Sequence, residues 1–164
     1  MKTVYVDITD IMTNDAVGYA QFVGAPKELI PEDKREAIHN KLVENNFFAI
    51  LPGTFIVDYI ARFPSVAKYT KFILSPDERV AEQQIEWVSR VMLNADKQPI
   101  DIEVVTLKDV PHEPNVLMIS ASYPDLIRHG GMGGEILHFK GLSQLEFVLG
   151  CISKARDVPL SIVK

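Results

Sequence analysis

The sequence of 164 residues contains a single cysteine, Cys151, and this scarcity limits the chemistry that one chain can hold. One thiol cannot form an intramolecular disulfide, and it cannot supply a cysteine-based zinc site. Long apolar runs are also missing, since no stretch reaches the roughly 18 residues that a membrane-spanning helix needs. The opening residues lack the charged-then-apolar pattern of a secretory leader. We therefore expect a cytoplasmic protein with no membrane partner.

Positive charge is in short supply as well. Lysine and arginine total 17 against 22 acidic residues, which gives a formal net charge of −5, and the two signs are interspersed. A nucleic-acid-binding protein needs a basic patch or stripe, so we expect no nucleic-acid partner. Hydrophobic residues make up 47% of the chain and charged residues 24%, as in ordinary globular proteins. This length and composition predict one domain over residues 1–164.

Apolar segments typical of strands alternate with segments typical of helices. Strands are expected at 2–8, 70–75, 101–106, 115–120 and 135–139, and helices at 32–45, 77–93 and 142–154. This alternation predicts an α/β protein, a three-layer sandwich with a mostly parallel five-stranded sheet and helices on its faces. The long interval between the first two strands predicts a small, helical, cap-like insertion at about 12–68.

Polar side chains follow four of these expected strands. Asp7 and Ser75 end or nearly end the first two, Lys108 follows the third, and Ser120 ends the fourth. Each alone is more simply explained as a cap, a turn or a solvated side chain. Because parallel sheets bind ligands beyond the carboxyl ends of their strands, the shared position of all four predicts a common cleft. Lys108 would supply the positive charge of this cleft, either by pairing with Asp7 or by holding an anion.

Two further features carry no site. The histidines lack the spacing of metal ligands, and no metal site is assigned to them. The glycine-rich run at 130–134 is not followed by the Gly-Lys-Ser/Thr of a phosphate-binding loop, so it is interpreted as a flexible turn.

The order of these segments resembles the haloacid dehalogenase (HAD) superfamily, most closely its 5′(3′)-deoxyribonucleotidase branch. The branch's proline-rich loop, helix and strand ending in Ser or Thr are similar to FFAILPGTFIVDYIARF followed by KFILSPDERVAEQQIEWV. Trp87 stands at the tryptophan of its Lys-x-x-Trp motif, and Gln84 replaces the lysine. Its lysine segment and last two strands resemble VVTLKDVPHEPNVLMIS and HGGMGGEILHF. The resemblance covers nearly the whole chain and implies a HAD-like Rossmannoid core.

The first departure from that family concerns the acid. HAD phosphatases carry Asp-x-Asp on the first strand, where the first carboxylate attacks phosphorus and the second protonates the leaving oxygen. Here the pair is Asp7 and Thr9, and a hydroxyl is too weak an acid for this role. Asp10 is one residue too far along, so on a strand it would point to the opposite face. Loss of a general acid typically lowers the rate by about 10²–10⁴-fold.

The second departure concerns the metal. The family's fourth strand ends in acidic residues that hold Mg²⁺, whereas this chain has Ser120-Ala121-Ser122, with Asp125 the nearest acid. Mg²⁺ is usually held by one or two carboxylates together with substrate phosphate and water. We therefore expect no cofactor, and Mg²⁺ only if the protein is an active phosphatase.

Three functions stay open. The preferred one is a catalytically degenerate, nucleotidase-related pseudoenzyme that binds a nucleotide, another small phosphate compound or a protein partner. The second is an active HAD-type phosphohydrolase acting on nucleotides or small phosphate esters, with Asp7 as nucleophile. The third is a metal-free hydrolase of dehalogenase type, whose serine-rich stretch with a later aspartate is similar to residues 120–125. The predicted catalytic residues are Asp7, Thr9, Ser75, Lys108 and Asp125, with Ser120 and Ser122 as ligand-binding residues.

Overall fold

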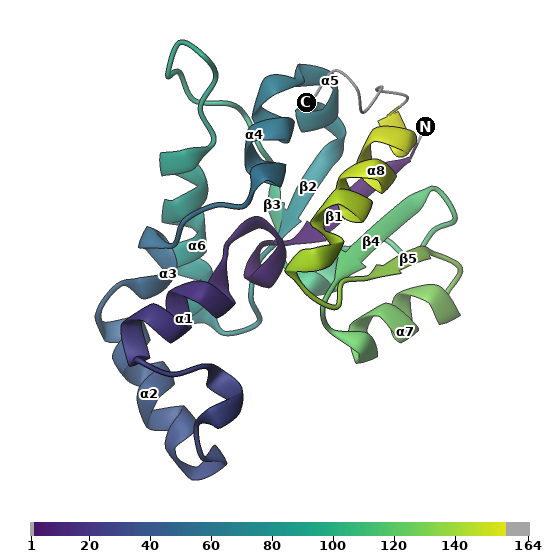
Figure 1. Ribbon diagram of the computed structural model, residues 1–164. Helices are drawn as coiled ribbons and strands as arrows, with labels where there is room; N and C mark the ends of the chain where they lie inside the picture. The colour runs from purple at the N-terminus through teal and green to yellow at the C-terminus, as the bar shows by residue number, and fades with distance from the viewer. Residues whose placement is uncertain (1, 157–164) are drawn as a thin grey trace.

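The computed structural model describes residues 2–156 and contains one sheet of five strands (Figure 1). The strands are β1 (Thr3–Asp7), β2 (Thr70–Ile73), β3 (Val104–Val105), β4 (Val116–Ser120) and β5 (Glu135–His138). Their spatial order is β3-β2-β1-β4-β5, and all four pairings are parallel. The predicted α/β class is confirmed, although β3 is shorter than expected because it pairs at the sheet edge over two residues only.

Helices connect successive strands. The α-helices are α1 (Asp15–Val23), α2 (Glu32–Glu44), α3 (Phe47–Ile50), α4 (Phe55–Arg62), α5 (Pro64–Tyr69), α6 (Glu78–Val91), α7 (Tyr123–Gly131) and α8 (Leu145–Arg156). A π-helical turn η1 (Ile8–Met12) follows β1, and the 3-10 turns are η2 (Lys27–Leu29), η3 (Leu107–Asp109) and η4 (Leu142–Gln144). Within residues 2–156, no helix has the length and apolar character that crossing a membrane requires.

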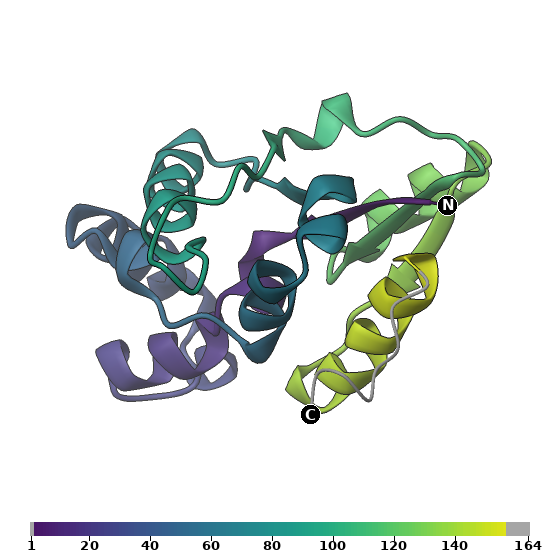
Figure 2. The same cartoon turned by 90° about the horizontal axis from the view of Figure 1, so that it is seen from above.

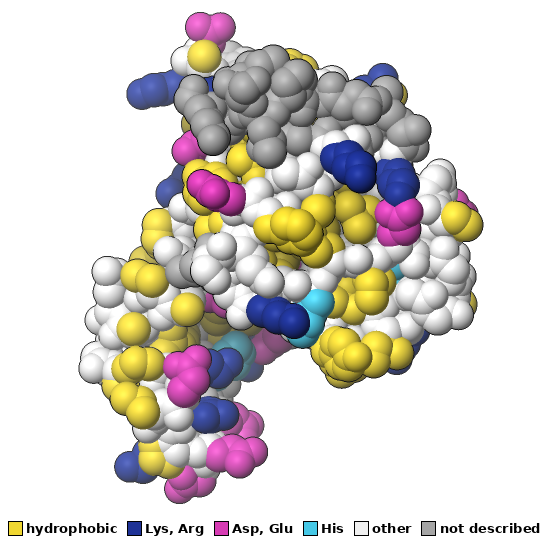
Figure 3. Space-filling model, turned by 45° about the vertical axis from the view of Figure 1, so that its right-hand side comes forward, with side chains coloured by type: hydrophobic (Ala, Val, Ile, Leu, Met, Phe, Trp, Pro, Cys, Tyr) yellow, Lys and Arg dark blue, Asp and Glu magenta, His cyan; other side chains and the backbone are white. Residues whose placement is uncertain are grey.

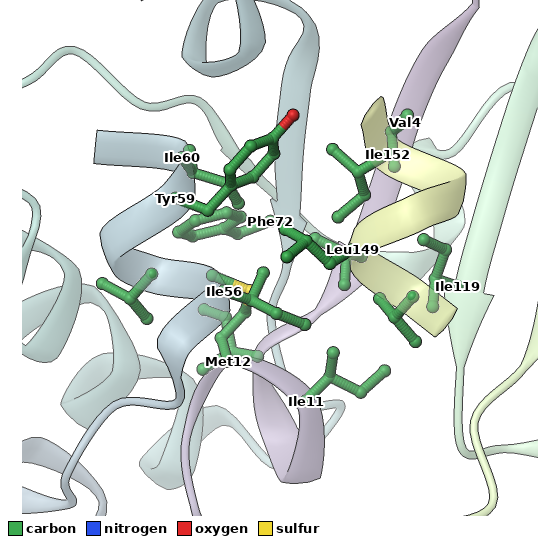
Figure 4. Close-up of a cluster of buried hydrophobic side chains, with 14 of the residues drawn as sticks. Val4, Ile11, Met12, Ile56, Tyr59, Ile60, Phe72, Ile119, Leu149 and Ile152 are labelled. Carbon is green, nitrogen blue, oxygen red and sulfur yellow. The ribbon is translucent and has the colours of Figure 1, made fainter. Parts of the chain in front are cut away.

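One face of the sheet carries the main hydrophobic core (Figure 4). Side chains alternate between the two faces of a strand, and Val4 and Val6 of β1 point to this face together with Phe72 of β2 and Ile119 of β4. Helices α4, α5 and α8 cover it, and they bury Ile56, Ile60, Val66, Leu149 and Ile152 against the strands. Burial of each of these aliphatic side chains contributes about 1.5–3 kcal/mol, so this cluster holds α4, α5 and α8 against the sheet.

The opposite face has a second and smaller cluster. Tyr5, Ile73 and Met118 point to it, and they contact Val110 and Leu126 from the cover on this side. That cover consists of α7 and the segment around η3, which Figure 2 shows on the side of the sheet away from α8. Two covered faces make the three-layer arrangement that the alternating strands and helices predict.

Helix α7 has no counterpart among the helices expected from the sequence. The sequence does not predict this helix because it has Pro124 near its start and Gly130 and Gly131 at its end. Proline is tolerated in a first helical turn because the missing N–H would have no partner there. The glycine-rich run interpreted as a turn is therefore partly helical, and the chain turns at Met132 and Gly133, whose φ is +99°.

The segment between β1 and β2 divides into two parts. Residues 15–51, which we call the projecting part, carry α1, η2, α2 and α3 and extend from one end of the molecule (Figure 1). They form a third hydrophobic cluster with Val80 of α6, which includes Tyr19, Leu42, Phe47 and Phe48. The remaining helices of the segment, α4 and α5, lie on the sheet as described above. The helical insertion expected at about 12–68 thus contributes both a projecting part and part of a sheet layer.

Candidate functional site

Polar residues gather at the carboxyl edge of the sheet. Asp7 is the last residue of β1, Ser120 is the last of β4, and Ser75 follows β2 by two residues. A cavity of about 350 Å³ opens at this edge. Its polar lining consists of Asp7, Thr9, Asp10, Ser75, Ser122 and Asp125, and its apolar lining includes Ile73, Leu74 and Leu107. Ligands bind at this edge in open parallel sheets, which makes the cavity the candidate site.

A short chain of hydrogen bonds orients Asp7. The hydroxyl of the fully buried Ser120 donates to Asp7 Oδ2, and the backbone N–H of Ser122 donates to Ser120 Oγ at 2.9 Å. Burial raises the pKa of Asp7 to about 7, against the lowering effect of the Ser120 hydrogen bond, and the nearby charges of Asp125 and Asp10 raise it further. At neutral pH this carboxyl is therefore divided between its protonated and ionised forms.

Asp10 enters the cavity because the chain leaves the strand directly after Asp7. Residues 8–12 form a π-helical turn in which Asp10 adopts φ +68°, and Asp10 lines the same cavity as Asp7. The expectation that Asp10 points to the opposite face is wrong, since that geometry requires a continuous strand. The backbone N–H of Asp10 donates to Asp15 Oδ1 at 2.8 Å, and the Thr13 hydroxyl donates to the same oxygen, so Asp15 holds the turn.

The carboxyl groups of this turn are also electrostatically perturbed. Burial raises the pKa of Asp10, the nearby Lys27 opposes this effect, and Glu28 adds to it. Burial raises the pKa of Asp15 to about 6, against the hydrogen bond from Thr13. Three acidic groups near one another thus hold their protons more tightly than they would in water.

Gln84 is a component of the site that was not among the predicted site residues. Its side chain on α6 is 1% exposed and bridges two parts of the cavity wall. Gln84 Nε2 donates to Thr9 Oγ1 at 2.9 Å, and the backbone N–H of Ser75 donates to Gln84 Oε1 at 2.7 Å. Gln84 could have been identified from its position three residues before Trp87, which corresponds to the lysine of the Lys-x-x-Trp motif that the sequence resembles. The amide fixes Thr9 and Ser75 without adding a charge.

Lys108 lies apart from the other predicted residues. It is exposed on η3, one residue after Leu107, and it is not part of the cavity lining. Within residues 2–156, no ion pair joins Lys108 to Asp7. The structure therefore brings together Asp7, Thr9, Ser75, Ser122 and Asp125, places Ser120 against Asp7, and leaves Lys108 outside.

A second and larger cavity of about 1090 Å³ adjoins the first. The two share Thr9, Asp10 and Ser75 in their linings, and we call the two together the cleft. The larger cavity runs along α1 and α2 to a wall that contains Tyr19 and Phe48. Figure 3 shows acidic side chains, with basic and histidine side chains beside them, in the hollow between the projecting part and the rest of the molecule. No cluster of three or more His, Cys, Asp or Glu side chains suited to a metal ion is found in the described part of the chain.

Comparisons with known proteins do not identify a family or a function for this chain. No protein-family model matches the sequence, and no curated protein sequence matches it. Among solved structures, a hydrolase from Pseudomonas syringae is 11% identical and covers 90% of each chain, with a TM-score of 0.48. At this distance the likeness carries no argument about activity.

Proposed function

We propose that this protein is a catalytically degenerate relative of the HAD superfamily that binds a small molecule in the cleft and does not hydrolyse phosphate esters with Mg²⁺. One observation carries the proposal. The lining of the smaller cavity includes the carboxyl groups of Asp7, Asp10 and Asp125 and no lysine or arginine. Phosphoryl transfer depends on cations that neutralise the transferring group. In the described part of the chain these acids are not grouped in a way that suits a metal ion, and a phosphate placed beside them alone would be repelled.

The state of the nucleophile supports the same conclusion. A carboxylate attacks phosphorus only when it is ionised, and a pKa of about 7 keeps about half of Asp7 protonated at neutral pH, which slows such an attack without abolishing it. A lysine at this position of α6, as in the Lys-x-x-Trp motif that the sequence resembles, would favour ionisation of Asp7. Gln84 is neutral, and its side-chain amide is already hydrogen-bonded to Thr9 and Ser75. The active-phosphohydrolase alternative is therefore the less favoured one. The nucleotide or other phosphate ligand predicted from the sequence is disfavoured by this lining, and a protein partner stays a prediction.

A second candidate, hydrolysis without metal, is favoured by the hydrogen bonds to Asp7. The Ser122–Ser120–Asp7 chain orients the carboxyl without any cation, and an uncharged substrate would not be repelled by the neighbouring acids. In this reaction an oxygen of ionised Asp7 attacks a carbon that bears a leaving group, and the leaving group departs with the bonding electrons. Water then hydrolyses the resulting ester and returns the carboxyl group of Asp7.

The two possibilities are separated by one set of assays. Wild type and Asp7→Asn are incubated with Mg²⁺ and either p-nitrophenyl phosphate or nucleoside monophosphates, and with the uncharged amide of a 2-haloacid without metal. The asparagine keeps an oxygen that can accept from Ser120, so the variant is expected to fold, which circular dichroism checks. We expect equal background phosphate release from both proteins. Phosphate release that is robust in wild type and lost in Asp7→Asn would overturn the proposal, while halide release with the same dependence would favour the second candidate.

A further inference from the structure

We propose that the ligand of the cleft is an organic cation, an amine carried on an aromatic or apolar body. The inference rests on the proposed function, in which the cleft binds a small molecule, and it adds the chemical class of that molecule. It follows from three independent properties of the cleft: its charge, its aromatic wall, and a buried hydroxyl without a partner.

The charge of the cleft is strongly acidic where the two cavities meet. Asp10 lines both cavities, Asp7 and Asp125 line the smaller one, and Asp15 lines the larger one. No residue within 2–156 donates a hydrogen bond to the side chain of Asp10. An ammonium group carries three donors and a positive charge, so it can contact several carboxylates at once.

The rest of the larger cavity does not reverse this balance. Its charged lining on η2 and α2 contains three acids, Glu28, Glu32 and Glu36, against the cations Lys27 and Arg35. Arg35 is partly engaged, since its Nε donates to the carbonyl oxygen of Ile30 at 3.2 Å. The remaining basic group, His39, contacts Asp77 at 2.9 Å. Across the cleft as a whole, acidic side chains outnumber cationic ones, so a cationic ligand is favoured over an anionic one.

The far end of the larger cavity is apolar and aromatic. Tyr19, Leu42, Phe47 and Phe48 line it, and all four are less than one-tenth exposed. Such a surface fits the body of a ligand whose charged group lies among the acids, because binding removes apolar area from water. The volume of the cavity is ample for a molecule of this size.

The hydroxyl of Tyr19 is the third property. It is buried and has no hydrogen-bond partner, although the residue lines the cavity and is 8% exposed. An unpaired buried polar group is costly, and most such groups in native structures have a partner. The oxygen itself lies just beneath the cavity lining, so a polar group on the ligand body would pair with it after a small movement of the ring.

The test compares amines with matched acids on the full chain. Calorimetry and thermal unfolding are run with tyramine, tryptamine, agmatine and spermidine, and with 4-hydroxyphenylacetate, in which a carboxylate replaces the aminomethyl group of tyramine. We expect at least one aromatic amine to bind and to raise Tm, and the acid at the same concentration to have no effect. Asp10→Asn should weaken binding about tenfold or more, since a hydrogen bond to a charged group is lost. Tyr19→Phe should weaken it about threefold or more. Glu82→Gln, an exposed acid on α6 outside the cleft, is the matched control and should have no effect.

Binding of the acid or of inorganic phosphate without binding of any amine would overturn the inference and leave a ligand-binding function standing. Failure of all four amines would overturn it as well. Phosphate release that depends on Mg²⁺ and Asp7 would overturn the proposed function itself, which makes the two failures distinguishable. Amine binding that is insensitive to Asp10→Asn and Tyr19→Phe would place the amine elsewhere and contradict the assignment.

Discussion

Replacement of Gln84 by leucine should loosen the carboxyl edge of the sheet without disturbing the rest of the fold. Leucine has a similar volume, so little packing is lost at this fully buried position. It removes the acceptor for the Ser75 N–H and the donor for the Thr9 hydroxyl. A buried group left without its partner costs about 1–3 kcal/mol, and both groups are half-buried, so water compensates in part. We expect the free energy of unfolding to fall by about 1–3 kcal/mol.

The neighbouring Gln83 offers a matched control. It also bridges two groups, accepting from the Phe48 N–H at 3.0 Å and donating to the Val43 carbonyl oxygen at 2.7 Å, but both lie in the projecting part. Gln83→Leu should therefore cost a similar amount and leave the smaller cavity intact. Urea unfolding measures the cost, and a domain of this size should lose roughly 2–4 °C of Tm per kcal/mol.

Amide hydrogen exchange then locates the effect. In Gln84→Leu the Ser75 amide should lose protection while the Phe48 amide keeps it, and Gln83→Leu should give the reverse. If Gln84→Leu changed stability by less than about 0.5 kcal/mol and Ser75 stayed protected, the bridge would not hold the site together, and the reasoning would be refuted.

Three further predictions concern single positions. The stability of Asp7→Asn relative to wild type should increase as pH rises from about 4 to 7 and should then level off. The reason is that the folded carboxyl has a pKa of about 7 against the ordinary 3.8, so unfolding of wild type releases a proton in that window. Urea titrations at several pH values measure this difference in stability, and a difference that is constant with pH would contradict the prediction. Gly18→Ala should destabilise by about 1–3 kcal/mol, since the added Cβ would lie 2.3 Å from Leu51 Cδ2. Gly131→Ala, with no atom within 4 Å, is its control in the same unfolding measurement, and equal effects would show that the contact with Leu51 is unimportant. Tyr19→Phe should raise the Tm of the ligand-free protein slightly, because it removes a buried hydroxyl without a partner, whereas a lower Tm would indicate that this hydroxyl is satisfied.

The sheet could be predicted because its information is local. Each strand is an apolar run that ends at a polar residue, and Asp7, Ser75 and Ser120 mark three of these ends. Parallel pairing then brings them to one edge without further information from the sequence. The helix expected at 77–93 is likewise present as α6, and Trp87 within it is 0% exposed.

The details of the site depend on contacts and turns that the pattern of residues does not reveal. The position of Asp10 follows from a π-helical turn, which local propensity does not distinguish from a continued strand. The role of Gln84 depends on a contact with Thr9 from a helix far along the chain. Lys108 lies outside the cavity because β3 ends at Val105 and the chain turns into η3, where Lys108 is exposed.

The most direct test of the central claim is a carboxyl-carbon NMR titration of Asp7, assigned by comparison with Asp7→Asn. In the structure, Ser120 orients Asp7 in a cavity at the carboxyl edge of the sheet, and the lining of this cavity has acids but no lysine or arginine. This arrangement predicts a titration midpoint near pH 7. A midpoint at or below about 4, the usual range of an aspartate, would show a carboxylate that is stably ionised at neutral pH, as a phosphatase requires, and would contradict the account.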